Sequence, residues 1–373
     1  MSSILRKLVA LVRTAFFVVI LTATANLSAQ HNEQKATGGE EPWQEEIEQQ
    51  EFQAGEIIIE HISDSYEWHI ITIGHTHVTI PLPVMLYDND EFHFFMSSAF
   101  HHNDGIHEGY FISHHDMNSG KIVKKGSNGE EIRPYLDFSF TKNVLAIFIS
   151  MFIMIFVFMS VAKSYKRRKG KAPKGLQSFL EPVILFVRDD IAKASIGEKK
   201  YEKYMPFLLT VFFFVLINNM LGIIPFFPGG ANVTGNIGVT GVLAAFTFII
   251  TTFSGNKNYW LHLINAPGVP WWLKLPIPLM PFVEIMGVFT KPFVLMVRLF
   301  ANITAGHIII LGFISLIFIF GEMSTGLGYG VAVISVAFSI FMDVLELLVA
   351  FIQAYVFTLL SALYFGMATE EHH

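Results

Sequence analysis

The chain has 373 residues, of which 52% are hydrophobic and only 15% are charged. This composition excludes an ordinary soluble globular protein, and several apolar runs are long enough to span a bilayer. The net charge is −6 and cysteine is absent, which excludes disulfide frameworks and thiolate metal sites. We predict an all-α polytopic membrane protein with about five membrane helices and a small β-rich N-terminal extramembrane domain. The sequence contains no phosphate-binding loop or paired zinc motif, so we predict no cofactor.

Residues 1–30 have the pattern of a secretory signal peptide. A basic region with Arg6, Lys7 and Arg13 precedes a short apolar stretch at 15–21, and small residues suited to cleavage follow. A short uncleaved anchor helix is the alternative interpretation. Both interpretations place the next segment outside the cytoplasm.

Residues 31–135 form an acidic segment that contains eleven histidines. A polar linker at 31–54 is followed by β-prone runs, with turn clusters near 88–90, 102–105 and 127–129. Paired histidines would suit zinc or copper. A solvated, weakly buffering surface is the interpretation we favour, because no fixed ligand spacing accompanies the histidines. We therefore predict a partly β domain without a metal site.

The first strong membrane helix is predicted over 136–162. A dense basic cluster follows at once, and the positive-inside rule places this loop, 163–174, in the cytoplasm. A nucleic-acid patch is the rival interpretation, but a basic block beside a membrane helix usually marks topology. Apolar residues at helical spacing over 176–195 predict an amphipathic helix on the same membrane surface.

Two further spans are predicted over 204–227 and 234–253. The Asn218–Asn219 pair in the first could line a polar path or form hydrogen bonds between helices. A loop over 256–275 precedes two overlong apolar runs at 276–320 and 326–368. As one helix, the first run would measure about 65 Å, so it must tilt, lie along the membrane, or break at Pro281 or Pro292. The short turn at 321–328 predicts a tilted helical hairpin.

Arg298 lies inside the first of these overlong runs. No acidic residue lies within ten positions on either side. A guanidinium is costly at bilayer depth and stays protonated, so its presence predicts a function. Snorkelling to the interface is the alternative, although the apolar sequence extends beyond a side chain's reach in both directions. The other candidate residues in the two runs are polar or ionisable: Glu284, Asn302, His307, Asp343, Glu346 and Gln353.

Helical periodicity sorts these residues onto faces. Arg298, Asn302 and Ala305 share one face, whereas His307 lies nine residues beyond Arg298 and close to the opposite side.

On the last helix, Asp343, Glu346 and Gln353 are predicted to share a face at i, i+3 and i+10. Glu346 could bond His307 only to neutralise both groups, and even that pair would mark a polar cleft.

Two long motifs in this region resemble subunit a of the F-type ATP synthase. Residues 298–307 read RLFANITAGH, and residues 346–358 read ELLVAFIQAYVFT. Residues 219–225, NMLGIIP, are similar to an earlier span of that family. The resemblance covers 136–373 and implies a proton-conducting stator subunit that is not catalytic by itself.

The resemblance also implies roles for the membrane residues. The arginine at position 298 faces the ring of c subunits, with two offset aqueous half-channels beside it. The half-channel open to the outside is expected to contain Asn302, His307, Glu346 and Gln353, and the cytoplasmic one Glu284. Asp343, also a candidate, has no assignable counterpart. Some bacterial members have glutamate where this chain has His307 and histidine where it has Glu346, which suggests that the two side chains interact.

The expected partners are the c-subunit ring, the b-subunit peripheral stalk, the rest of the ATP synthase and membrane lipid, without nucleic acid. The expected location is the bacterial inner membrane, with the N-terminal domain in the periplasm. Proton and sodium coupling both remain open. The alternative function is a stand-alone ion or metal transporter that uses the histidine-rich domain.

Overall fold

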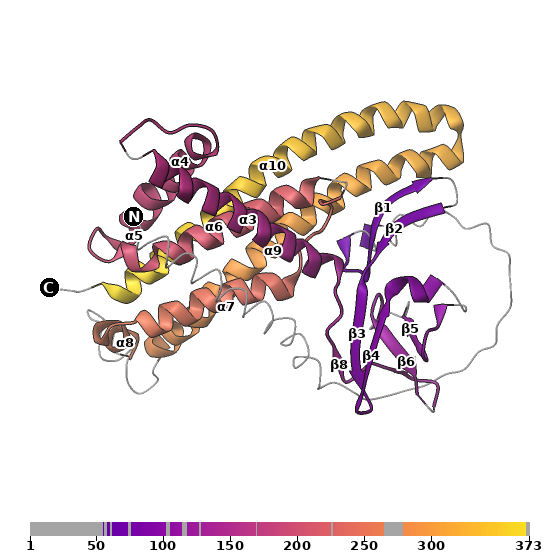
Figure 1. Cartoon of the computed structure of the whole chain (residues 1–373), viewed down its shortest axis with the longest axis horizontal. Helices are drawn as coiled ribbons and strands as arrows, with labels where there is room; N and C mark the ends of the chain where they lie inside the picture. The colour runs from indigo at the N-terminus through magenta and orange to yellow at the C-terminus, as the bar shows by residue number, and fades with distance from the viewer. Residues whose placement is uncertain are drawn as a thin grey trace.

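The computed structural model describes residues 62–370, with gaps at 74–75, 102–104, 114–117, 127, 169, 225–226 and 265–278, together with residues 55, 58 and 59. The predicted signal peptide and the linker at 31–54 lie outside the described residues. A helical bundle carries a small β domain at one end (Figure 1).

The β domain consists of three small antiparallel sheets. Strands β1 (Glu67–Ile73) and β2 (Thr76–Pro81) form a hairpin. The second sheet has the order β4-β3-β8, with β3 Pro83–Asp88, β4 Glu91–Met96 and β8 Leu136–Asp137. The third has the order β5-β6-β7, with β5 Tyr110–Ile112, β6 Ile122–Lys125 and β7 Glu131–Ile132. A short 3-10 helix, η1 (Ser97–His101), follows β4.

The hairpin between β3 and β4 shows why this sequence folds locally as it does. Its two turn residues, Asn89 and Asp90, have φ angles of 49° and 64°, which asparagine and aspartate tolerate in a type I′ turn. Along β3 the side chains alternate, so that Val84 and Leu86 are buried in the domain core. The predicted β-rich N-terminal domain is thus confirmed.

The first membrane helix, α3 (Lys142–Arg167), begins later than predicted. The expected start at Leu136 is wrong, because that residue belongs to β8. The helix begins after an N-cap, in which the Thr141 hydroxyl accepts a hydrogen bond from the Val144 amide. The Asp64 carboxylate reinforces this start. It accepts hydrogen bonds from the Thr141 hydroxyl at 2.7 Å and from the Asn143 amide at 3.0 Å.

The remaining helices follow in the predicted order. They are α4 (Leu176–Phe186), a π-helical segment η3 (Val187–Lys193), α5 (Ala194–Ile196), α6 (Tyr201–Ile223), α7 (Ile237–Ser254), α8 (Lys257–Ile264), α9 (Leu279–Met323) and α10 (Thr325–Thr369). Within the described part of the chain, five helices are long and apolar enough to cross a membrane: α3, α6, α7, α9 and α10. The predicted fold class is therefore confirmed.

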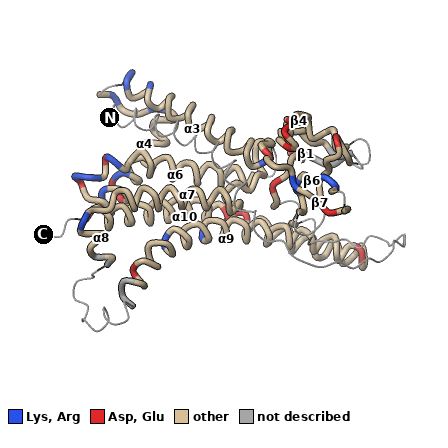
Figure 2. The backbone as a smooth tube through the Cα atoms, turned by 90° about the horizontal axis from the view of Figure 1, so that it is seen from below, with Lys and Arg blue, Asp and Glu red and all other residues tan. Residues whose placement is uncertain are grey.

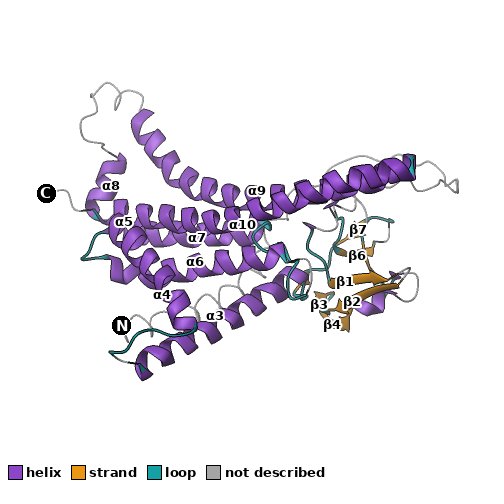
Figure 3. Ribbon diagram, turned by 90° about the horizontal axis from the view of Figure 1, so that it is seen from above, coloured by secondary structure: helices purple, strands orange, loops and turns teal. Residues whose placement is uncertain are grey.

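Helices α9 and α10 form one long hairpin. Each has 45 residues, which corresponds to about 68 Å. The proposed break at a proline is wrong, since α9 continues through both Pro281 and Pro292. Ser324 alone separates the two helices, and a Cβ at Gly328 would lie 2.8 Å from the Gly321 Cα, so glycines permit this tight turn. Figures 1 and 3 show the hairpin extending beyond α6 and α7 to the level of the β strands.

Helix α6 lies at the centre of the bundle, and 61% of its most apolar 18-residue stretch is buried. Its Leu208 and Phe212 lie in one core with Leu299 of α9 and with Phe357 and Phe365 of α10. This core fixes the side of α10 that faces inward.

Basic residues gather at one end of the helical bundle. Figure 2 shows lysine and arginine at the end of the bundle opposite the β domain, including the C-terminal end of α3 and the region around α5. Acidic residues are spread over both the β domain and the helical bundle.

Candidate functional site

Arg298 lies on the outward side of α9. The inward side is marked by Leu295, Leu299 and Ile303, which recur every four residues and are all buried. Arg298 and Asn302 are exposed, as is Ala305, so the predicted shared face is confirmed. Within the described residues, no carboxylate forms an ion pair with Arg298.

The surface around this guanidinium is apolar and partly flat. Phe293 and Val294 are exposed one turn before Arg298, and the small exposed residues Ala301 and Ala305 follow it. Small side chains allow another membrane helix to approach closely. The outward face of α9 therefore offers a permanent cation beside a surface that a second helix can contact.

His307 and Glu346 form the pair that the sequence predicted. The His307 Nδ1 lies 2.7 Å from the Glu346 Oε1, and their side chains are 14% and 4% exposed. Among the described residues, this carboxylate oxygen has no aligned hydrogen-bond partner. The imidazole of α9 and the carboxyl group of α10 are thus in close contact inside the bundle.

Two glycines make room for this pair. A Cβ at Gly306 would lie 3.1 Å from Glu346 Oε1, and a Cβ at Gly222 of α6 would lie 3.7 Å from His307 Nε2. Helices α6, α9 and α10 therefore converge on the histidine. Neither glycine was predicted from the sequence, because its role depends on which helices meet.

A buried amide adjoins the pair. Asn219 of α6 donates to the Ala350 carbonyl of α10 at 3.2 Å and accepts from the Thr234 hydroxyl at 2.5 Å. Its neighbour Asn218 donates to the Phe214 carbonyl of its own helix. Of the two interpretations of the asparagine pair, hydrogen bonding between helices is confirmed for Asn219.

The three polar residues of α10 lie toward one face but differ in exposure. Glu346 and Gln353 are buried, whereas Asp343 is exposed. Asp343 lies at the exposed edge of this face, because an offset of three residues rotates it by about 60° relative to Glu346, but it stays within electrostatic reach of Glu346 and His307. This rotation is enough to turn it out of the helix contact.

Arg298 and His307 occupy separate places on α9. Their nine-residue separation corresponds to about 14 Å along the helix axis. The arginine is exposed on the outward side, and the histidine contacts α10. The structure therefore brings together His307 and Glu346 but not Arg298 with either of them.

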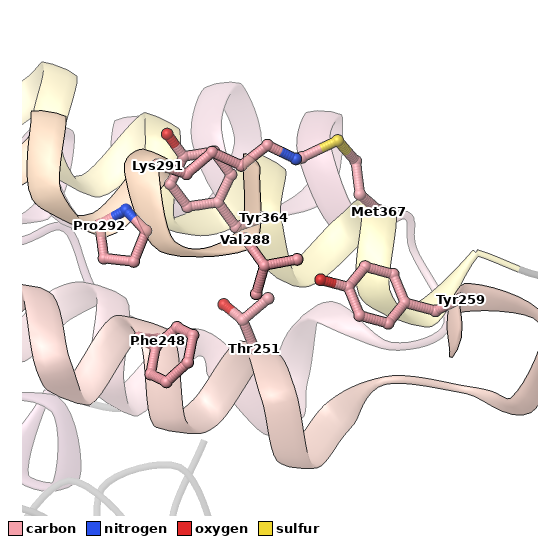
Figure 4. Close-up of a pocket in the computed structure, with 8 residues that line it drawn as sticks. All are labelled: Phe248, Thr251, Tyr259, Val288, Lys291, Pro292, Tyr364 and Met367. Carbon is pink, nitrogen blue, oxygen red and sulfur yellow. The ribbon is translucent and has the colours of Figure 1, made fainter. Parts of the chain in front are cut away.

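A second polar region lies between α7, α8, α9 and α10 (Figure 4). This pocket is lined by Phe248, Thr251, Tyr259, Val288, Lys291, Pro292, Tyr364 and Met367. The Lys291 ammonium lies 5.8 Å from the centre of the Tyr364 ring. Burial raises the pKa of the Tyr259 phenol, and the nearby Glu284 carboxylate raises it further. Glu284 is half-buried. Because its charge acts on Tyr259, which lines the pocket, Glu284 lies near this pocket and not near the His307 pair.

Two histidines of the β domain each contact a carboxylate closely. His93 lies 2.6 Å from Glu108, and His101 lies 2.7 Å from Glu67. Among the residues that the structure describes, no group of three or more potential ligands could hold a metal ion.

The five candidate spans and the intramembrane charges define a multi-pass membrane protein with ionisable groups in its bundle. The profile of the family described as "ATP synthase A chain" matches residues 144–366. The chain belongs to this family and is therefore a non-catalytic component of the ATP synthase complex.

Curated relatives agree. The chain is 45% identical over 244 residues to "ATP synthase subunit a" of Chloroherpeton thalassium, which covers 63% of this chain and 69% of the relative. It is 44% identical over 282 residues to "ATP synthase subunit a 2" of Prosthecochloris aestuarii, which covers 72% of this chain and 82% of the relative. A second family profile, for a domain of unknown function, matches residues 57–139.

Proposed function

We propose that this chain is the proton-conducting stator subunit of the F-type ATP synthase, in which proton flow past Arg298 drives rotation of the c ring. One observation carries the proposal: Arg298 is exposed and lacks an ion-pair partner among the described residues, on a face that another helix can approach. Its partner is then the carboxylate of a passing ring subunit. Family membership supports this function over a stand-alone transporter.

The energy of such a contact is sufficient for the task. At about 4 Å and an effective dielectric of about 20, two unit charges attract by about 4 kcal/mol. That attraction corresponds to a change of about three pKa units in the ring carboxyl. Arg298 holds the ring carboxylate ionised and, because it never releases a proton, prevents a direct proton leak along α9.

The outer half-channel is assigned to the buried polar groups between α6, α9 and α10. An imidazole and a carboxyl group meet at His307 and Glu346, and Gln353 is buried on the same side of α10. Asn302 lies one turn from Arg298 on the outward face of α9. We assign it to the point where this half-channel meets the ring.

The cytoplasmic half-channel is assigned to the pocket near Glu284. The pocket lies between four helices, and Lys291 and two tyrosines give it polar groups. It begins about 10 Å along α9 from Arg298, since Lys291 precedes the arginine by seven residues. Asp343 is exposed and has no assigned step.

The topology follows from the same assignment. We place the basic loop 163–174 in the cytoplasm, because basic residues gather at the end of the bundle opposite the β domain, and the histidine-rich segment 31–135 in the periplasm. Residues 1–30 are assigned as a signal peptide, and the membrane domain begins with α3 at Lys142. Each proton that crosses about 150 mV delivers about 3.5 kcal/mol, which the ring passes to the catalytic head. The b-subunit stalk holds the chain against this torque.

A cysteine cross-linking experiment tests the proposal. The chain has no cysteine, so Ala305→Cys introduces a single thiol on the outward face of α9. We expect oxidation to join it to a cysteine on the ring helix in membrane vesicles, with the soluble head co-purifying. The matched control, Ile303→Cys, is buried on the inward side and should not cross-link. Equal cross-linking of both variants, or none from Ala305→Cys, contradicts the proposed face.

A further inference from the structure

The β domain has a second apolar face, opposite its core. In β4, Phe92, Phe94 and Met96 alternate with inward residues and are 59%, 64% and 41% exposed. Their partners in β3 are Tyr87, Met85 and Pro83, in that order, and these also alternate with buried residues. Two strands therefore present six apolar or aromatic side chains on one side.

The third strand extends this face toward the membrane. Leu136 of β8 pairs with Tyr87, and the Phe138 and Phe140 amides continue the ladder by donating to the carbonyls of β3. Between them, Asp137 binds the Tyr66 hydroxyl on the core side. Alternation places Leu136, Phe138 and Phe140 on the outer side. We call these nine residues of three strands the outer face.

The outer face is unusual because the other side of the same sheet is already the domain core. There Val84, Leu86 and Phe95 pack against Tyr110 and Ile122. In a small antiparallel sheet, one face normally packs on the core and the other face is polar and exposed to water. On the outer face Phe92, Phe94 and Met96 are exposed and the other six residues are half-buried. A contiguous accessible apolar face of this kind marks an interaction site.

Its position indicates the occupant. Phe140 stacks on Phe148 of α3 with ring centres 5.6 Å apart, and α3 begins only two residues after Phe140. Farther along α3, Phe152 and Phe156 are exposed as expected of lipid-facing residues. Figures 1 and 3 show β3 and β4 beside the N-terminal end of α3, with β6 farther away. The outer face is thus continuous with the lipid-facing surface of a membrane helix.

We propose that the outer face is a membrane-docking surface, which inserts its aromatic side chains into the lipid interface beside α3. Aromatic and aliphatic side chains suit this depth. The nine residues include no charge, and the exposed residues at the adjoining turn, Asp90 and Glu91, are acidic. Attraction to anionic lipid therefore does not drive the docking, which proceeds equally on zwitterionic membranes.

Docking gives the β domain a second attachment to the membrane sector. The first is Trp68 of β1, which is buried against Ala231 and Val233 beside α3 and meets the Phe227 ring at 5.2 Å. Both attachments adjoin the start of α3. Together they hold the domain on the membrane surface while the ring rotates past the other side of the bundle.

Spin labelling tests the proposal in the assembled complex. Phe94→Cys and Phe92→Cys each place one thiol on the outer face, and Asn128→Cys is the control at an exposed turn elsewhere in the domain. Labelled complexes are reconstituted in phosphatidylcholine vesicles, with and without phosphatidylglycerol. Collision of the label with oxygen, which partitions into lipid, is compared with collision with a water-soluble nickel chelate.

We expect both outer-face labels to collide with oxygen several-fold more, relative to the nickel chelate, than the control label, in both lipid compositions. Labels as accessible to nickel as the control would overturn the proposal. Immobilised labels protected from both reagents would also overturn it, because they would show a protein partner or a second copy on this face. Cross-linking at Ala305 does not depend on the result, so the two proposals fail separately.

Discussion

Exchanging His307 and Glu346 tests the pair at the meeting point of α9 and α10. We predict that His307→Glu and Glu346→His each impair proton-driven ATP synthesis severely. The double exchange should recover much of the loss, because it restores one imidazole and one carboxylate at the same contact.

The magnitude follows from the geometry. The two atoms are 2.7 Å apart and both side chains are largely buried. Each single exchange places two like groups, either two carboxyl groups or two imidazoles, at this contact, and breaking a buried pair costs about 3 to 5 kcal/mol. Residues in direct contact show coupling energies of about 0.5 to 3 kcal/mol. In rate terms, a coupling of about 1.4 kcal/mol gives about a tenfold difference between the double variant and the product of the single effects.

The assay is ATP synthesis in inverted vesicles under an imposed pH gradient and membrane potential. ATP-driven proton pumping in the same vesicles supplies a second measurement. Immunoblotting of this chain and of the ring confirms that each variant assembles. Leu347→Ala is a suitable control, since this residue adjoins Glu346 but is exposed on the outward side of α10.

One result would refute the reasoning. If the double exchange lost as much activity as the two single losses multiplied together, His307 and Glu346 would act independently. The contact would then be only a consequence of helix packing.

Three further predictions concern packing and pH. Gly366→Ala should lower the melting temperature of the detergent-solubilised complex, because its Cβ would collide with a backbone carbonyl of α5, whereas Gly312→Ala has open space and should not. Asn219→Leu should weaken the α6–α10 contact and increase amide exchange in both helices, and unchanged exchange would argue against this bond. Burial alone would raise the pKa of Asp88, but hydrogen bonds from Lys124 and Tyr110 outweigh it and hold this pKa below its usual range. The β domain should therefore keep this stability above about pH 4 and lose it as the pH falls further, which amide exchange of β3 between pH 7 and 3 would show and Asp88→Asn would flatten.

Much of the bundle follows from the sequence because apolar length and charge placement determine it. The runs that became α6, α7, α9 and α10 were located to within a few residues, since a bilayer demands long uninterrupted apolar helices. The predicted start of α3 was wrong because an apolar residue such as Leu136 is compatible with a strand as well as with a membrane helix. Only the cap formed by Asp64 and Thr141, which are distant in sequence, decides between them.

The candidate site was predictable in part for a similar reason. Arg298 and His307 are conspicuous because charge at bilayer depth is rare, and their opposite faces follow from helical geometry. The roles of Gly306 and Gly222 depend on which helices meet, which no local pattern encodes. The pocket near Lys291 likewise forms only when four helices come together.

The most direct measurement of the central claim is proton-driven ATP synthesis by Arg298→Ala in membrane vesicles. Val294→Ala, one turn earlier on the exposed side of α9, serves as the control. We predict that the arginine variant assembles with the ring and head but synthesises no ATP, that Arg298→Lys retains at most a trace, and that the control remains active. ATP synthesis by an assembled Arg298→Ala complex at the control rate would contradict the account.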